Sequence, residues 1–174
     1  MWLVSCYFGA MFNVFSERAK QIVFAARLKA GERDSNIVDV DDFLVGLVLE
    51  DQGLLTDMLS KLHGEPVTFV RSAESHVPFF PPKTAQDLLS SLEKLLPPPK
   101  PVVPTTSASV SPALKRVFDS AKALQSQFQH TRIQPLHLLA ALLAEESSQG
   151  VQLLQGSGIT REKVLRALGA PADN

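Results

Sequence analysis

The sequence of residues 136–143 is Leu-His-Leu-Leu-Ala-Ala-Leu-Leu, and that of residues 43–49 is Phe-Leu-Val-Gly-Leu-Val-Leu. Both stretches are apolar on nearly every side of a helix, which is typical of a central helix enclosed by its neighbours. A shift of 95 residues places Phe43 on Leu138 and keeps the two stretches in register. The chain therefore contains two candidate core helices of the same kind.

The same shift relates the segments that precede these helices. It places Ser16 on Ser111 and Ala26 on Ala121, and it aligns two apolar stripes at helical spacing. After a small difference in length, a shift of 94 places Gly64 on Gly158. Self-similarity at a fixed spacing indicates a duplicated structural unit.

We therefore predict an all-α fold of two pseudo-symmetric four-helix repeats, about eight helices in total. Ser16 and Ser111 are suited to cap the first helix of each repeat, and acidic residues crowd the start of the first central helix. The predicted third and fourth helices are 54–62 and 66–74 in the first repeat, and 151–155 and 160–168 in the second. No segment alternates between apolar and polar residues for long, so we expect no sheet.

An insert separates the two repeats. Nine of the twelve prolines lie between Pro78 and Pro112. Within the insert, residues 84–96 carry leucines at helical spacing, which predicts one additional helix that packs on the first repeat or offers an apolar face to a partner. The prolines predict an extended spacer over 97–110. The expected organisation is an extension over 1–10, a first repeat over 11–76, an insert over 77–110 and a second repeat over 111–170.

Composition excludes several classes of protein. The 174 residues carry a net charge of -1, which offers no electrostatic footprint for nucleic acid. The single cysteine, Cys6, supplies neither an intramolecular disulfide nor a cysteine-based metal site, and it fits a reducing compartment. The apolar run over 1–10 is about half the ~20 residues of a membrane-spanning helix, and no basic residue precedes Arg18. We expect a cytoplasmic protein whose natural start is Met11. The alternative is that residues 1–10 are a frayed terminal segment.

Three segments carry a likeness to a known family: Met-Phe-Asn-Val-Phe-Ser-Glu-Arg-Ala-Lys at 11–20, Ser-Pro-Ala-Leu-Lys-Arg-Val at 111–117, and the run at 136–143. They resemble the double Clp-N repeat, the N-terminal domain of the Clp/Hsp100 unfoldases. The resemblance implies two four-helix repeats that recruit substrates and adaptors for an ATP-driven unfoldase, which then feeds a peptidase. No Gly-x-x-x-x-Gly-Lys-Ser/Thr phosphate loop occurs in the chain. We therefore expect a free-standing Clp-N domain that acts as an accessory or regulatory subunit of Clp machinery.

The resemblance also implies a candidate ligand site. Some family members bind phosphorylated arginine through a hydroxyl at the start of a repeat and a carboxylate just before the central helix. The matching positions are Ser16 with Asp41 in the first repeat, and Ser111 with Leu136 in the second. Leucine offers a guanidinium no acceptor, so we expect weak or absent phosphoarginine binding, confined to the first repeat. The alternative is that Ser16 and Asp41 are plain helix caps.

A second candidate site is apolar. Phe79 and Phe80 lie among Pro78, Pro81 and Pro82, and a short irregular segment does not easily bury two aromatic rings. Exposed aromatic clusters often mark a docking surface for a partner. The alternative is that both rings fold back and cover the groove between the repeats.

The histidines give no sign of catalysis or metal binding. His63, His76, His130 and His137 lack metal-ligand spacing, and no nucleophile motif accompanies His137, which we interpret as a structural residue at a helix start. We predict a protein- or peptide-binding domain that is not an enzyme, needs no cofactor, and binds neither nucleic acid nor membrane. The alternatives are a recruiting head split from a Clp ATPase, a small hydrolase using His137, and a transcriptional or scaffold protein.

Overall fold

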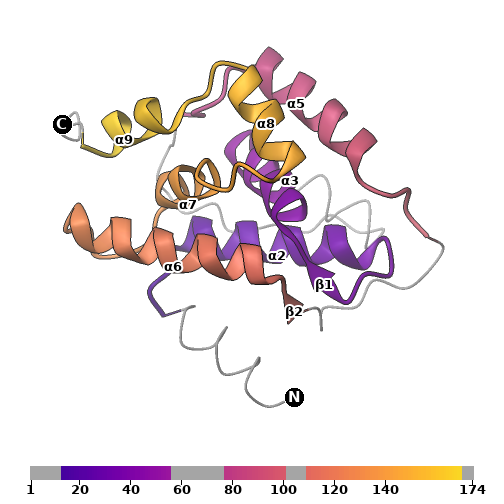
Figure 1. The fold of residues 1–174 in the computed structure, drawn as a ribbon, viewed down its shortest axis with the longest axis horizontal. Coiled ribbons are helices and arrows are strands. Elements are labelled where there is room, and N and C mark those ends of the chain that lie inside the picture. The colour runs from indigo at the N-terminus through magenta and orange to yellow at the C-terminus, as the bar shows by residue number, and fades with distance from the viewer. Residues whose placement is uncertain (1–12, 56–76, 101–108, 170–174) are drawn as a thin grey trace.

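The computed structural model describes residues 13–55, 77–100 and 109–169, and this part of the chain is mostly helical (Figure 1). Its helices and strands, in chain order, are α2 (Glu17–Gly31), β1 (Ile37–Val38), α3 (Val40–Asp51), α5 (Pro82–Leu95), β2 (Ser109–Val110), α6 (Pro112–Gln127), α7 (Pro135–Leu142), α8 (Gln149–Gly156) and α9 (Arg161–Gly169). Helices α8 and α9 lie where a third and a fourth helix were predicted. The predicted helix at 66–74, the predicted extension over 1–10, and all but the first two residues of the predicted helix at 54–62 lie outside the described residues.

Helices α2 and α3 pack closely as a pair. A Cβ placed on Gly46 of α3 would lie only 2.9 Å from the Ile22 carbonyl oxygen and 3.1 Å from the Ala26 amide nitrogen. Only a glycine lets the two backbones approach this far without a shift. Phe43 and Leu44 are fully buried, as expected of a central helix.

Helices α6 and α7 form a second pair, which meets the first through aromatic rings. The Phe118 ring on α6 lies edge-on to the rings of Phe15 and Phe43, with centroids 5.5 Å and 5.4 Å away. All three rings are buried. Helix α8 contacts α3, and α9 contacts α7, so one continuous core runs through both pairs.

The backbone links between the two pairs run in both directions. The Ser16 amide donates to the Ile133 carbonyl over 3.0 Å, and the Ser111 amide donates to the Val38 carbonyl over 2.9 Å. The two bonds are equivalent under the 95-residue shift, which places Ser16 on Ser111 and Val38 on Ile133. Each serine therefore donates to the acceptor of the other half. The two left-handed residues outside glycine in the described segments, Asp34 and Gln129, obey the same shift.

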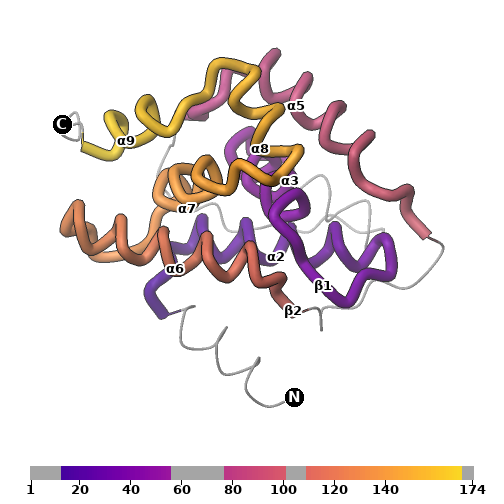
Figure 2. Tube along the Cα trace, viewed as in Figure 1, coloured from indigo at the N-terminus to yellow at the C-terminus, as the bar shows by residue number. Residues whose placement is uncertain are grey.

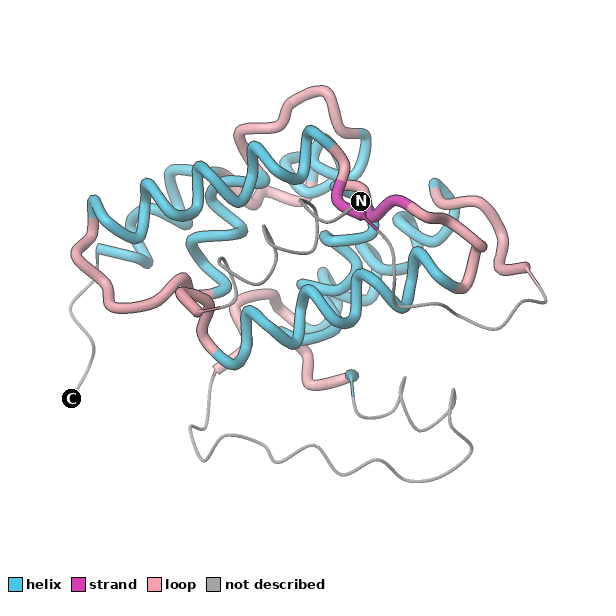
Figure 3. The backbone as a smooth tube through the Cα atoms, turned by 90° about the horizontal axis from the view of Figure 1, so that it is seen from below, coloured by secondary structure: helices cyan, strands magenta, loops and turns pink. Residues whose placement is uncertain are grey.

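The expectation of no sheet is wrong in one detail. Strands β1 and β2 pair in parallel over two residues each (Figure 3), and Phe15 forms an isolated bridge with Ile133. Two residues are too few to leave an alternating pattern in the sequence. These strands form because the tertiary fold brings two extended segments together, each just before or after a helix.

The insert helix α5 packs across both halves of the molecule. It contacts α3 and α8, and Figure 2 shows it running beside α8. Its inward face buries Ala85, Leu88 and Leu92. It begins at Pro82, two residues before the predicted start, because proline is tolerated in the first turn of a helix. Of the two expectations for this helix, packing is the one observed, and it involves α8 as well as α3.

Candidate functional site

Ser16 and Asp41 lie at opposite ends of the first helix pair. Ser16 caps α2, and its Oγ accepts a hydrogen bond from the Ala19 amide over 3.2 Å. Arg18, two residues further on, pairs with Glu50 at the far end of α3. Asp41 is nine residues before Glu50, which is about 14 Å along the helix axis. Because α2 and α3 run antiparallel, Ser16 and Asp41 lie toward different ends of the pair, and a ligand site formed by both residues stays a prediction.

Asp41 instead caps a helix of the other half. Its Oδ1 accepts hydrogen bonds from the Ser148 hydroxyl over 2.7 Å and from the Gly150 amide over 3.2 Å, at the start of α8. A Cβ on Gly150 would overlap this oxygen. A carboxylate at a helix N-terminus satisfies amides that have no intrahelical partner. Asp41 thus acts as a cap, as the alternative interpretation described, although the helix it caps is not its own.

Ser111 hydrogen-bonds to Asp39, a residue of the first helix pair. Its Oγ accepts from the Leu114 amide over 3.1 Å and donates to Asp39 Oδ1 over 2.8 Å. Asp39 is the N-cap of α3, so a serine of the second pair meets a carboxylate of the first. Sequence reasoning compared positions within one repeat and missed this crossing. The shift alone carries no information on which repeat supplies each partner.

The turn before α3 contains a buried ion pair. Asp42 Oδ2 accepts the Asp39 amide over 3.0 Å, and Asp42 Oδ1 accepts from the Arg33 guanidinium. The Asp42 and Arg33 side chains are 3% and 9% exposed. Burial raises the pKa of the Asp42 carboxyl, while the hydrogen bonds from the Asp39 amide and Arg33 act in the opposite direction.

The turn before α7 places a histidine in the equivalent position. His137 is fully buried, and its Nδ1 accepts the Gln134 amide over 2.8 Å. Its Nε2 therefore carries the proton and donates to His130 Nδ1 over 2.8 Å. Burial, reinforced by His130, lowers the pKa of His137 from 6.5 to about 4. Both ring nitrogens are engaged within the fold, so His137 is structural.

A pocket of about 320 Å³ opens where α3 ends and α7 begins. We call it the α3–α7 pocket. It is lined mainly by apolar side chains: Leu47, Val77, Pro78, Phe79, Phe80, Pro135, Leu136 and Leu139, with Arg18 and Asp51 as the polar members. Leu136, the position where the resemblance would place a carboxylate, is half-buried in its wall.

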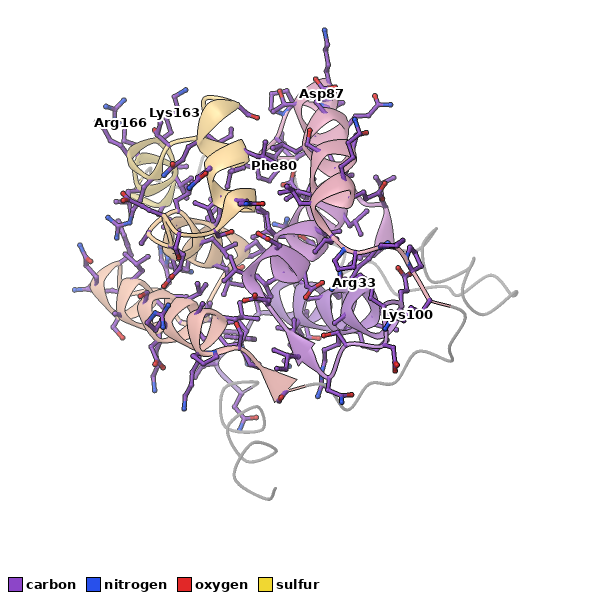
Figure 4. All side chains as sticks on the ribbon, turned by 45° about the vertical axis from the view of Figure 1, so that its right-hand side comes forward. Arg33, Phe80, Asp87, Lys100, Lys163 and Arg166 are labelled. Atoms are coloured by element: carbon purple, nitrogen blue, oxygen red, sulfur yellow. The ribbon has the colours of Figure 1, made fainter. Side chains whose placement is uncertain are left out.

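The two predicted phenylalanines have different environments in this pocket. Phe80 is 1% exposed and belongs to the core, and Figure 4 shows it in the interior. Phe79 is half-buried, with its ring edge-on to Phe80. Asp51 accepts the amides of Phe79 and Phe80 over 2.8 Å and 3.0 Å. The self-packing alternative therefore describes Phe80, whereas Phe79 remains available as a wall of the pocket.

The polar groups of the pocket have partners inside the fold. Arg18 donates from Nε and Nη2 to the two carboxylate oxygens of Glu50, over 2.7 Å and 3.0 Å. Asp51 accepts the two backbone amides described above and also a bond from Gln52. The pocket thus suits an apolar group, because no buried charge needs a partner from the ligand. No group of three or more His, Cys, Asp or Glu suited to a metal ion occurs among the described residues.

Comparison with known proteins gives a family match over most of the chain. The model of the Clp repeat (R) N-terminal domain matches residues 14–157. The chain is 24% identical over 164 residues to the chaperone protein ClpB of Oceanobacillus iheyensis, covering 92% of this chain and 18% of that protein. It is 24% identical over 169 residues to the chloroplastic chaperone protein ClpC of Pisum sativum, covering 95% of this chain and 16% of that protein. The chain thus spans less than a fifth of the length of these relatives.

Solved structures show the same fold. The N-terminal domain of the chaperone ClpD from Arabidopsis thaliana matches with a TM-score of 0.60 and 16% identity, over 90% of this chain and 96% of that one. A structure described as part of a malarial protein secretion system matches with a TM-score of 0.60 and 17% identity, over 89% of this chain and 92% of that one. Within the described residues, no helix is both long and apolar enough to span a bilayer.

Proposed function

The chain belongs to the Clp repeat N-terminal domain family, and from this membership we propose that it is a non-catalytic protein-binding domain serving Clp protease machinery. In this role it is a cytoplasmic accessory or regulatory subunit that recruits substrates or adaptors. Its partners are proteins or peptides rather than nucleic acid or membrane. The near-neutral charge supports the exclusion of nucleic acid.

The proposal includes a duplicated architecture of two repeats of four helices. Three pairs of observations support it, each related by the shift of 95 residues. They are the caps at Ser16 and Ser111, the crossed amide bonds to Ile133 and Val38, and the left-handed residues Asp34 and Gln129.

Recognition is proposed to use the α3–α7 pocket. The observation that carries this is an open apolar pocket whose polar members, Arg18 and Asp51, are already paired within the fold. A volume of about 320 Å³ accommodates one large side chain, such as a leucine or phenylalanine of an extended polypeptide. Burial of such a side chain contributes about 1.5–3 kcal/mol, which suits weak and reversible recruitment.

The second candidate is a recruiting head that works with an ATPase encoded separately. The relatives are more than five times longer than the aligned region, which favours a function tied to a motor. A gene for a Clp ATPase directly downstream, and co-purification of the two products, supports this form over an independent regulator.

The test is a pull-down from native cell extract with the chain as bait, scored for Clp peptidase, unfoldase and adaptor subunits. Leu136→Glu places a charge in the pocket wall and is expected to abolish recovery. Leu89→Glu, at a half-buried leucine of α5 outside the pocket, is the matched control and is expected to retain it. Recovery of no Clp subunit, or equal recovery by both variants, contradicts the proposal.

A further inference from the structure

Residues 96–100, Leu-Pro-Pro-Pro-Lys, begin in a polyproline II conformation at Leu96, and we call them the proline ridge. Leu96 has φ −79° and ψ 144°, which are polyproline II values. Each proline fixes its own φ and excludes the helical region for the residue before it. Leu96, Pro97, Pro98 and Lys100 all precede a proline, so the sequence favours polyproline II at Pro97 and Pro98 and an extended conformation at Lys100.

The proline ridge is fixed at both ends. It continues directly from the last turn of α5, and Leu96 packs against the core. At the other end, the Lys100 amide donates to the Glu32 carbonyl over 2.8 Å. Proline has no amide hydrogen, so the ridge leaves no donor unsatisfied at Pro97, Pro98 or Pro99. A ligand segment ordered in advance loses little conformational entropy on binding.

The ridge presents its rings to the exterior. A polyproline II helix has three residues per turn, so Leu96 and Pro99 share one face, Pro97 and Lys100 a second, and Pro98 lies on the third. The inward packing of Leu96 turns the other two faces outward. Every residue from Pro97 to Lys100 is exposed. No acidic side chain among the described residues pairs with Lys100.

A cavity of about 240 Å³ adjoins the ridge, between the three prolines, the C-terminal end of α2, Val45 in the middle of α3 and Glu93 of α5. Its apolar wall is formed by Val45, Leu96 and the prolines. Its cationic members are already paired, Lys29 with Glu32 and Arg33 with Asp42, and Glu93 adds a carboxylate to the lining, so the cavity does not select an anion. Arg33 and Lys100 lie at the same corner of the molecule in Figure 4. The volume fits one aromatic side chain stacked on a proline ring.

We propose that the proline ridge is a docking element for a partner domain with an aromatic-lined, proline-binding groove and an acidic rim. Aromatic rings of the partner pack between the pyrrolidine rings, one of them enters the cavity, and a carboxylate of the rim meets Lys100. This is the mode in which aromatic grooves recognise preformed polyproline II segments. The ridge is separate from the α3–α7 pocket, so the inference does not rest on the proposed function.

Calorimetric titration of the full chain with three purified probes tests the proposal: an SH3 domain, a WW domain and a profilin. Saturable binding to at least one probe is expected. The double variant P98A/P99A removes two rings and their φ restraint, and it is expected to weaken that binding by about tenfold or more. Lys100→Glu is expected to weaken it less. Pro112→Ala, at an exposed proline in the first turn of α6, is the control and is expected to bind like the original chain.

Two outcomes overturn the inference. One is the failure of all three probes to bind. The other is binding that P98A/P99A leaves unchanged while far-UV circular dichroism shows the fold intact, because the contact then lies elsewhere. Leu136→Glu is expected to leave probe binding unchanged, so failure of the ridge and failure of the pocket are distinguishable.

Discussion

Two equivalent turns, one before α3 and one before α7, use different side chains to accept the backbone amide of the N-cap residue. In both, the third helical residue accepts the amide of the N-cap residue, Asp42 from Asp39 and His137 from Gln134. Asp42 is then held by the Arg33 guanidinium, and His137 by the ring of His130. The first turn therefore buries a pair of opposite charges, whereas the second turn buries His137 in its neutral form at pH 7. The two turns share a hydrogen-bond pattern, but a mutation or a change of pH in each is expected to change the free energy of unfolding by a different amount.

The largest effect is expected from breaking the ion pair in the first turn. Arg33→Ala leaves the Asp42 carboxylate buried without its cation, and loss of one partner of a buried pair costs about 3–5 kcal/mol. Urea unfolding at pH 7 measures the change in the free energy of unfolding. Lys29→Ala, which removes the more exposed Lys29–Glu32 pair, is the control and is expected to cost less than about 1 kcal/mol. Equal costs for the two variants contradict the account of this turn.

The second turn is expected to govern the response to acid. The folded pKa of His137 is about 4 against an ordinary 6.5, so the unfolded chain takes up the proton first. The stabilisation that results from the lowered pKa of His137 is complete above pH 6.5. As the pH falls toward 4, the free energy of unfolding decreases by up to about 3 kcal/mol. The raised pKa of Asp42 has the opposite effect on stability, because the folded state binds this proton more readily than the unfolded state does. The contribution of Asp42 to the free energy of unfolding therefore increases as the pH falls.

Unfolding curves at pH 7.5, 6 and 5 measure this dependence. His137→Gln keeps an acceptor for the Gln134 amide and removes the titrating ring, so it is expected to flatten the loss between pH 6.5 and 5. A profile that His137→Gln leaves unchanged shows that another group controls the acid response.

The next effect concerns the link between the two halves at Asp41. Asp41→Ala removes the acceptor for the Ser148 hydroxyl and the Gly150 amide, at an expected cost of about 2 kcal/mol. Hydrogen exchange is expected to accelerate in α8 more than in α2. Asp87→Ala, at an exposed carboxylate of α5, is the control and is expected to change neither measurement. Unchanged protection in α8 means that Asp41 does not hold this helix.

The two serine caps are expected to differ by a smaller amount in how much stability is lost when each is replaced by alanine. Ser16→Ala removes one cap, at about 1 kcal/mol. Ser111→Ala removes the equivalent cap and also the donor to Asp39, which adds about 1 kcal/mol. Thermal unfolding of the two variants measures the difference. Equal losses show that the Ser111–Asp39 hydrogen bond contributes nothing to stability.

The smallest expected effect is the binding of a phosphoarginine peptide to the chain. Ser16 and Asp41 lie apart, Asp41 is engaged with α8, and Leu136 offers no acceptor. Calorimetry with a phosphoarginine peptide is therefore expected to show weak binding or none. Two tight sites contradict this expectation.

The sequence predicted the helices better than it predicted the contacts between residues that are far apart in the chain. The caps at Ser16 and Ser111 and the buried character of 43–49 and 136–143 follow from residue type and spacing. The partners of Asp39 and Asp41 are side chains 72 and 107 residues away, which no local pattern encodes. The α3–α7 pocket likewise combines four separate segments, at residues 18, 47–51, 77–80 and 135–139, and only Phe79 and Phe80 gave a signal in the sequence for an apolar site.

The most direct test of the account is to locate where the chain contacts an unfolded polypeptide. Backbone amide shifts of the full chain, recorded by NMR during titration with unfolded casein, report that contact residue by residue. Recognition through the α3–α7 pocket predicts saturable changes centred on Arg18, Phe79 and Leu136, absent in Leu136→Glu and retained in Leu89→Glu. Changes centred elsewhere, or none at any concentration of casein, contradict it.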